Sequence, residues 1–595
     1  MLRSISPSKG GSAYVTAHRL AAALAAATSL VMLANVNTAR AQSAQYIAPS
    51  QVTPRSFVPS QSTGPRTFEI SAAAGLTAPA GAEQFSLVVG RVDLEGGFPE
   101  LDESNAALAA RLSGKRITVA EIFAAAADLE RAYANAGYAL VRLTVPPQKL
   151  VDGGPVRLIV LNGFIEEVKV DGVPERVRDV VAARARALVD RRGLRLAEIE
   201  RLILIAGDFS GLQLRSALAR GRETGGSVLV IEGEHRLVTG AVNLDNRLPS
   251  ALSGKQGTIS ASINSALGFG EQLYVSAGSA MGDVLNNFPF VQSPLRVLGV
   301  GATAPVGDNG VTVNPEYTYS HSTRAQTLQT LGTTGAFQRF AMRANYPMIR
   351  ERTRTLIAKA DVEYVKQHVF ASDFELRLNA DRYRAARFDL DWQSATPWGA
   401  PYRVDIQLSK GLGGRNGADA LWSETPLSRQ GASPWFTKLS ARGWLSQPLP
   451  ANLQANIIGV AQTSFGEPLL LPEQMSVEGP EQLSGLPPGL VLVDTGGTLR
   501  GELAYLQPGP ASDYGLLALS PYVFVAGGLG RIHQATIVEK STLRAGSFGV
   551  GLRTNYNLKD GFSGIMLGVE FGQEYSNIPG RAAAHRVNAY GGMRF

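Results

Sequence analysis

The 595-residue sequence contains no cysteine, so it gains nothing from disulfides and offers no thiolate to a metal ion. Histidine is scarce, at six residues, and no Glu-flanked His pair with the spacing of a metal site occurs. The phosphate-binding sequence Gly-x-x-x-x-Gly-Lys-Ser/Thr is missing as well. We therefore expect no catalytic site, no metal and no cofactor.

Long apolar runs are confined to the N-terminus, where Leu20–Ala34 is almost entirely Ala, Leu, Val and Met. Basic residues precede this run, and the small-x-small sequence Ala39-Arg40-Ala41 follows it. This order predicts a secretory signal peptide over residues 1–41. The alternative is an N-terminal membrane anchor, for which the run is short. No later apolar run is long enough to predict a transmembrane helix.

Charge is modest, with 18% charged residues and a formal net charge of +7. The sequence has no basic cluster, so we expect no nucleic-acid partner. The mild positive excess suits an acidic partner or an anionic membrane surface. The length exceeds that of one ordinary domain.

Residues 42–82 are rich in proline, which blocks helices and sheet ladders alike. The prolines are Pro49, Pro54, Pro59, Pro65 and Pro79. We expect an extended linker here, with a short strand around Phe68–Ile70.

Residues 83–163 predict a small α/β module. Phe85–Leu94 alternates as a strand does. Thr118, with Glu121 three positions later, predicts a capped helix that ends at Gly137. Two short strands complete the order β-α-α-β-β, at Ala139–Leu143 and Val156–Val160.

The same order returns over residues 164–235. A strand, a helix starting at Pro174 and a second helix precede two final strands, which are Leu212–Ala217 and Ser227–Ile231. Two tandem copies of one module indicate repetition rather than a single enzyme fold.

Residues 236–595 predict strands only. In Leu356–Tyr364, apolar residues alternate with Lys359, Asp361 and Glu363. Apolar residues on one face and charged residues on the other are typical of a barrel wall between lipid and a wet lumen. A soluble sandwich has the same period but rarely needs strands this long. At about 22 residues per strand with its loops, this segment predicts roughly 16 strands.

The end of the first module resembles the outer-membrane transporters of two-partner secretion, of the haemolysin or filamentous-haemagglutinin secretion and activation type. The residues that carry this resemblance are Gly137, Tyr138, Pro146, Gln148, Leu150, Gly153, Gly163, Ile165 and Val168. The start of the barrel segment is also similar, at Val242, Asp245, Asn246, Gly254, Asn264, Leu267, Gly268 and Gly270. The family usually has an acidic residue where this sequence has Asn162.

The resemblance implies a mixed fold, with two tandem α/β POTRA modules followed by a 16-stranded antiparallel transmembrane β-barrel. The boundaries are then 83–163 and 164–235 for the modules and 236–595 for the barrel. The implied protein lies in the outer membrane of a Gram-negative bacterium, with its POTRA modules in the periplasm. Its partners would be a secreted exoprotein client, outer-membrane lipid and, during biogenesis, the barrel-assembly machinery.

The implied function is export of an unfolded exoprotein. One alternative is an insertase of the same superfamily, which places other barrels in the membrane; two modules favour export. Another is a passive porin or an adhesin, against which the two modules argue.

In the family, a loop between late strands folds into the pore and carries a Val-Arg-Gly-aromatic tip. By register that tip is Gln482, Leu483, Ser484 and Gly485, with Ser484 in place of the Arg. A wall strand usually carries Phe-x-Asp-x-Gly, and the matching residues are Phe524, Ala526 and Gly528, with Ala526 in place of the Asp. Losing one partner of a buried pair would cost about 3–5 kcal/mol, whereas losing both is tolerable. We expect the loop to be held differently, through Arg500, Glu502 or Asp494.

A POTRA sheet with a free edge can accept an extended client as an added strand. We expect this contact on the strand that begins at Leu212, through Leu212, Leu214, Arg215 and Ala217. The alternative is that these residues only complete the core of the module. Many relatives thread a helix through the pore, but the prolines of residues 42–82 predict no stable plug helix, or one displaced from the lumen.

Overall fold

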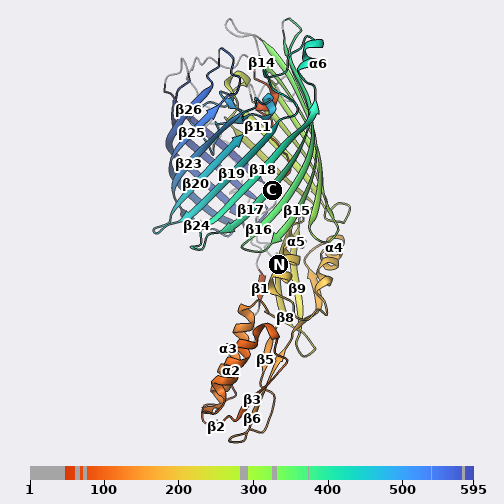
Figure 1. Ribbon diagram of the computed structural model, residues 1–595, viewed down its shortest axis with the longest axis vertical. Coiled ribbons are helices and arrows are strands. Elements are labelled where there is room, and N and C mark those ends of the chain that lie inside the picture. Colours follow the sequence, from red (N-terminus) through yellow and green to blue (C-terminus); the bar gives the residue numbers. More distant parts are fainter. Residues whose placement is uncertain are drawn as a thin grey trace, which may run out of the picture.

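The computed structural model describes residues 47–59, 68–70, 77–281, 293–324, 332–372, 374–537, 539–578 and 583–595. The expected signal peptide lies outside the described residues. Figure 1 shows a barrel with two α/β modules extending from one end. In the part of the chain that the structure describes, no helix is both long and apolar enough to cross a membrane.

The first POTRA module packs two helices against short strands. Its elements are β2 (Ser86–Val88), β3 (Arg91–Glu95), α2 (Asp102–Leu112), β4 (Arg116–Thr118), α3 (Val119–Asn135), β5 (Arg142–Thr144) and β6 (Pro155–Leu161). The predicted capping box is confirmed, since Thr118 Oγ1 accepts from the Glu121 N–H at 3.2 Å. The Glu121 carboxylate accepts in return from the Thr118 N–H at 2.6 Å. Two apolar stripes, from α2 and α3, fill the core over the strands.

Two predicted strands of this module were wrong in extent. Phe85–Leu94 is not one strand, because β2 pairs with β4 while β3 pairs with β6. The chain changes partner at Gly90, where a Cβ would lie 2.3 Å from the Gly153 carbonyl oxygen. The strand expected from Ala139 begins only at β5, because the Val141 N–H closes a turn on the Tyr138 carbonyl oxygen. Alternation alone does not reveal such a change of partner.

The second POTRA module repeats this plan. Its elements are β7 (Phe164–Asp171), α4 (Glu175–Ala185), α5 (Leu196–Gly207), β8 (Leu212–Arg220) and β9 (Gly226–His235). The sheet order is β1-β8-β9-β7, where β1 (Phe68–Ile70) comes from the proline-rich linker. The modules meet at Gly163, where a Cβ would lie 2.0 Å from the Leu140 carbonyl oxygen, so only glycine fits.

The barrel is closed and antiparallel throughout, as predicted. Its elements are β10 (Val238–Asp245), β11 (Gln256–Asn264), β12 (Gln272–Ala280), β13 (Leu295–Val306), β14 (Val311–Arg324), β15 (Thr333–Arg350), β16 (Thr355–Ala371), β17 (Leu376–Ala395), β18 (Pro401–Gly414), β19 (Thr437–Pro448), β20 (Leu453–Thr463), β23 (Thr495–Tyr505), β24 (Gln507–Ala511), β25 (Gly515–Arg531), β26 (Thr542–Leu558), β27 (Gly564–Ser576) and β28 (His585–Arg594). Because β23 and β24 follow one another along β25, these seventeen elements form sixteen strands. Closure comes from the pairing of β10 with β28.

The wall alternates as the sequence predicts. Phe340, Val362 and Phe388 are 50%, 54% and 50% exposed on the outside. Charged residues beside them, such as Glu363 and Arg387, are buried toward the lumen. The outer surface is therefore the apolar, lipid-facing side, and the lumen is polar.

Candidate transport path

A long loop between β20 and β23 folds against the inward-facing side chains of the barrel wall. It includes β21 (Met475–Ser476), which pairs with β22 (Leu492–Val493). Its apolar side chains pack on the wall around Ala526 and Leu543. A Cβ added to Gly528 would lie 2.9 Å from Leu483 Cδ1, so the loop rests directly on the wall strand. The structure thus brings together the loop residues and the wall residues that the sequence singled out.

The loop residue Ser484 contacts a cation of the wall. Arg500 on β23 is fully buried, and its Nη1 donates to Ser484 Oγ at 2.8 Å. The same guanidinium pairs with Glu502 at 2.7 Å and with Glu570 at 2.5 Å. It also stacks on Phe524, 3.7 Å from the ring centroid. The sequence-based expectation that Arg500 or Glu502 holds the loop agrees with these contacts.

The tip of the loop has further polar contacts with the wall. Gly485 donates its N–H to Ser547 Oγ at 3.0 Å, and Asn588 Nδ2 donates to the Ser484 carbonyl oxygen at 2.7 Å. Gln482 closes the preceding turn, with its N–H on the Gly479 carbonyl oxygen.

Asp494, which was also expected to hold the loop, lies at the end of the loop, directly before β23. Its carboxylate accepts from the Leu469 N–H at 3.0 Å, from Gln474 Nε2 at 2.9 Å and from the His533 N–H at 2.7 Å. Asp494 is fully buried. Asp494 therefore joins the two ends of the loop to each other and to the backbone of the turn after β25.

A second ionic anchor was not identified from the sequence. Glu473 of the loop pairs with Arg387 at 2.7 Å and with Lys438 at 2.7 Å, and it accepts from Tyr383 Oη at 2.7 Å. All four side chains are buried. The only sequence signal is that Arg387 and Lys438 occupy inward positions of wall strands, which does not identify their partner.

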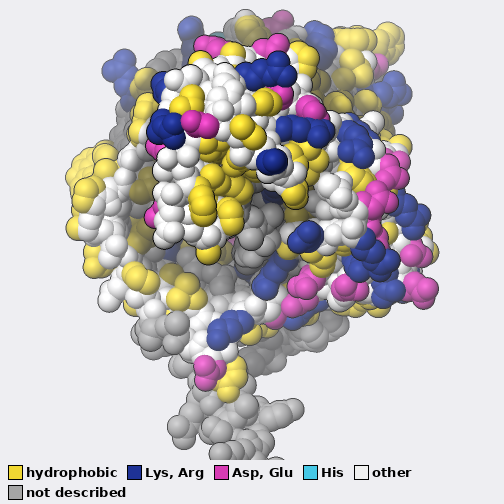
Figure 2. All heavy atoms as spheres, turned by 90° about the horizontal axis from the view of Figure 1, so that it is seen from below, with side chains coloured by type: hydrophobic (Ala, Val, Ile, Leu, Met, Phe, Trp, Pro, Cys, Tyr) yellow, Lys and Arg dark blue, Asp and Glu magenta, His cyan; other side chains and the backbone are white. Residues whose placement is uncertain are grey.

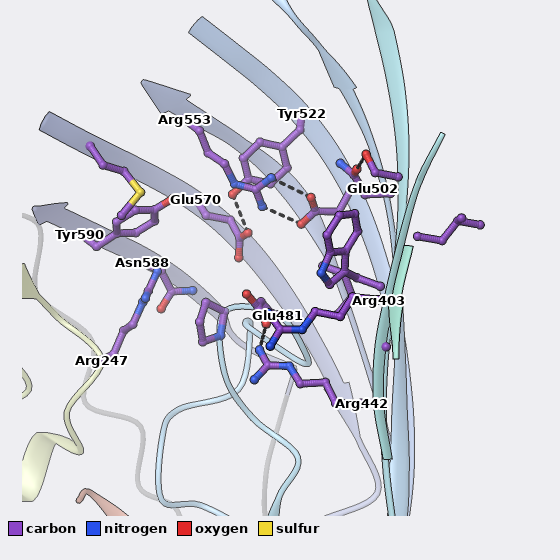
Figure 3. A pocket seen from close by; sticks show the side chains of 18 of the residues that line it. Arg247, Arg403, Arg442, Glu481, Glu502, Tyr522, Arg553, Glu570, Asn588 and Tyr590 are labelled. Atoms are coloured by element: carbon purple, nitrogen blue, oxygen red, sulfur yellow. Dashed lines mark hydrogen bonds and ion pairs between the residues drawn. The ribbon is translucent and has the colours of Figure 1, made fainter. Parts of the chain in front are cut away.

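Beside the loop lies a polar cavity of about 840 Å³. Figure 3 shows Arg403, Arg442 and Arg553 converging on it together with Glu481, Glu502 and Glu570. Arg553 pairs with Glu502 at 2.7 Å, and Tyr522 Oη donates to Glu570 at 2.8 Å. Both signs of charge therefore line this part of the lumen, which suits a wet passage for a chain of mixed composition.

The linker also enters the lumen. Residues 47–59, the red segment inside the barrel in Figure 1, contain a single turn of 3-10 helix, Pro49–Gln51. Glu316 accepts from the Phe57 N–H at 2.8 Å, and Arg339 donates to the Pro54 carbonyl oxygen at 3.0 Å. Residues 47–59 contain no longer helix, and the expectation of no stable plug helix stays a prediction, because not all of the linker is described. Residues 42–46 lie outside the described part of the chain.

The family of haemolysin secretion/activation proteins (ShlB/FhaC/HecB) matches residues 225–554, more than half of the chain. The chain belongs to this family. A ShlB-type POTRA domain matches residues 87–163 as well. The protein is therefore a two-partner secretion transporter of the outer membrane, with its POTRA modules in the periplasm. A search of curated protein sequences gave no significant match.

Solved structures share the fold. CdiB from Escherichia coli is 19% identical with a TM-score of 0.64, covering 88% of this chain and 94% of its own. CdiB from Acinetobacter baumannii is 14% identical with a TM-score of 0.56, covering 86% and 90%. These likenesses show that the order of modules and barrel recurs in solved structures.

The POTRA modules of this ShlB-type transporter dock on the periplasmic turns of the barrel. Asp208, at the end of α5, forms a two-pronged pair with Arg350, at 2.7 and 2.8 Å. Arg184 of α4 donates to the Gly307 carbonyl oxygen at 3.0 Å. These contacts fix the direction in which the second module presents its sheet.

One carboxyl at this docking surface has a shifted pKa. Burial raises the pKa of Glu200, and the charge of Arg352, 3.8 Å away, opposes the shift.

The expected client residues lie on β8. Leu212 and Leu214 are buried in the core of the module, whereas Arg215 is exposed. The edge itself is occupied, because β1 pairs with β8 in parallel and places Glu69 opposite Ala217. Leu212 and Leu214 therefore complete the core of the module, which is the alternative that the sequence left open.

The periplasmic face of the modules is of mixed charge. Figure 2 shows Lys and Arg side chains interleaved with Asp and Glu, with hydrophobic side chains between them. Among the described residues no group of three side chains has the character of a metal site.

Proposed function

We propose that the exoprotein client is captured by strand addition to the edge of β8, after β1 has left it. The barrel then opens when the linker and the folded-in loop withdraw from the lumen. The drive would be folding of the client outside the cell, so the cycle has no catalytic step. Arg215 and the backbone of Ser216–Leu218 are the proposed contacts.

The observation that carries this proposal is the β1–β8 pairing. Three residues of the linker pair in parallel with Ser216, Ala217 and Leu218. An edge that accepts a parallel strand through backbone hydrogen bonds can accept another extended segment in its place. The described part of this pairing is three residues long, and a pairing of that length favours exchange over permanent closure.

The role of the expected residues is refined by their burial. Leu212 and Leu214 would hold β8 on its module, and Arg215 and Ala217 would face the client. β7, at the other edge of the sheet, offers a second backbone edge and serves as the comparison.

The lumen is closed by two separate segments, so two releases are needed. The linker is held through Glu316, Arg339 and Arg343, which contact its backbone at Phe57, Pro54 and Arg55. The loop is held through Arg500, Arg387 and Lys438. All of these contacts are polar, and most of the side chains that make them are buried, so each release needs a partner that replaces the lost contacts.

A photo-reactive residue at Arg215 tests the proposal directly. During secretion we expect covalent adducts with the client from Arg215, and several-fold fewer from a probe at Lys169 on β7. The substitution Glu69→Pro disrupts β1 by removing a backbone donor, and should increase the Arg215 adducts. Equal labelling from both edges, or no client adduct at Arg215 in the Glu69→Pro protein, would reject strand addition at β8.

Two further partners belong to the proposal. The outer wall would contact membrane lipid along its exposed apolar side chains. The terminal strand would serve barrel assembly, since Phe595 closes the ladder against Gly240 through backbone hydrogen bonds of 2.9 and 3.0 Å. We propose no nucleic-acid partner.

A further inference from the structure

The outer face of the barrel carries a cluster of cations at its extracellular end. The cluster lies on β16, β17 and β18, and all its members are exposed: Lys366, Arg377, Arg382, Arg384 and Lys410. Asp381, Tyr383 and Ser409, which are chain neighbours of Arg382, Arg384 and Lys410, are buried toward the lumen. Because side chains alternate along a strand, these cations point outward. These five residues are called the outer basic patch below.

Like charges are adjacent within the patch. Lys366 lies directly opposite Arg382 in the ladder between β16 and β17. Side chains directly opposite one another are about 5 Å apart at Cβ, and like charges there are destabilising. The salt bridges of these strands join inward residues, and none within the described residues reaches Lys366, Arg382 or Arg384. Among the described residues, no ion pair therefore neutralises these three cations.

The patch borders the apolar band of the wall. On β16 the outward residues below Lys366 are apolar or aromatic from Tyr364 to Leu356. Eight residue steps span about 27 Å along a strand, or about 21 Å along the membrane normal at a tilt of 40°. This is close to the apolar band of roughly 25 Å in outer-membrane barrels. The patch therefore lies at the level of the lipid head groups, on the side away from the POTRA modules.

Exposed aromatic residues surround the patch. Trp435, 58% exposed, is next to Lys410, whose Nζ donates to the Trp435 carbonyl oxygen at 3.1 Å. Phe374, which precedes β17, and Trp422, the last residue of the short helix α6 (Gly417–Trp422), are 70% and 89% exposed. Aromatic side chains at this level are typical of residues that sit among lipid head groups.

Another part of the barrel wall has outward cations that are not directly opposite one another. On β25 and β26 two outward cations occupy the same end of the barrel, but Arg531 faces Thr542 and Arg544 faces Leu529. They are therefore not opposite one another, and they provide a natural comparison.

We propose that the outer basic patch binds the phosphates of lipopolysaccharide, the phosphorylated, acylated saccharolipid of the outer leaflet. Guanidinium and ammonium groups are well suited to phosphate, and the apolar band below accommodates the acyl chains. Phospholipids of the inner leaflet lie at the other end of the barrel. The bound lipid holds β17 at a fixed depth, and the opposite face of β17 carries Arg387, the anchor of Glu473.

The test uses the full-length protein in detergent and native mass spectrometry with bisphosphorylated lipid A. Removing one cation is expected to weaken binding about fivefold, so K366Q/R382Q should weaken it about 25-fold. The matched variant R531Q/R544Q should bind as the native protein does. Dephosphorylated lipid A should bind native protein and K366Q/R382Q equally.

Equal losses in the two double variants, or none in K366Q/R382Q, would overturn the proposal. Displacement of lipid A by an equal concentration of inorganic pyrophosphate would overturn it too, since the patch would then be a small-anion site. Folding is checked by the heat-dependent gel mobility of barrels. If K366Q/R382Q does not fold, R384Q/K410Q probes the same patch with the same expectation.

Discussion

The buried guanidinium of Arg500 is the contact on which closure of the loop depends most. It joins the loop residue Ser484 to Glu502 and Glu570 on the wall. In Arg500→Gln, Glu502 keeps Arg553, but Glu570 loses its cation. Breaking a buried pair in this way costs about 3–5 kcal/mol. This cost falls on the stability of the wall, because both carboxylates lie on wall strands. The loop itself loses only the hydrogen bond between Ser484 and Arg500, worth about 1.5–3 kcal/mol, so its release becomes roughly 10- to 10²-fold more frequent.

Single-channel recording in planar bilayers measures this directly. We expect Arg500→Gln to show frequent openings and a lower unfolding temperature. Ser484→Ala removes the same hydrogen bond but leaves the wall pairs of Arg500 intact, so it should open about as often as Arg500→Gln with a smaller loss of unfolding temperature. Arg553→Gln is the matched control, because Arg553 shares Glu502 but has no hydrogen bond or ion pair with the described loop residues.

A swap variant separates charge from position. Ser484→Arg with Arg500→Ser returns the cation to the loop while leaving both wall carboxylates in place. It should close more often than Arg500→Gln alone. Channel traces of Arg500→Gln that match the native protein, or a swap variant as open as Arg500→Gln, would refute the reasoning.

Three further predictions follow from other contacts. Glu473→Gln leaves Arg387 and Lys438 buried without their carboxylate, and should cost about 3–5 kcal/mol in thermal unfolding while raising conductance; native behaviour in both assays would contradict the second anchor. Asp208→Asn weakens a partly exposed pair by about 1 kcal/mol and should broaden spin-label distances between module and barrel, whereas unchanged distances would show that other contacts dominate. The pKa of Glu121 is lowered, chiefly by the Thr118 N–H, so its stabilisation of α3 is complete above pH 4.5 and is lost as pH falls through the lowered value. Hydrogen exchange in the first turn of α3 should rise over that window in the native protein but not in Glu121→Gln.

Much of the fold could be predicted because it depends on local periodicity. The capping box of Thr118 and Glu121, the repeated module order and the two-residue alternation of the wall are all properties of neighbouring residues. Two errors came from the same source: the strand before Gly90 and the strand after Ala139 alternate well, yet their pairing partners, not their pattern, set their limits.

The candidate site was only partly predictable. The predicted joint departure from the family at Ser484 and Ala526 stays a prediction, whereas Arg500, Glu502 and Asp494, named from the sequence as possible holders of the loop, do lie in its contacts. It did not connect Glu473 with its two cations, because Arg387 lies 86 residues away and Lys438 lies 35 residues away.

The sequence by itself determined which side chains face lipid and which face the lumen, since that depends only on alternation along each strand. Only the tertiary structure decided which inward charges meet, because barrel closure and strand register bring distant residues to one level. The same holds for β1, whose three residues are assigned to the edge of β8 by the fold alone. Backbone pairing at the edge of a sheet depends little on side-chain identity, so no local sequence pattern could predict that β1 pairs with β8.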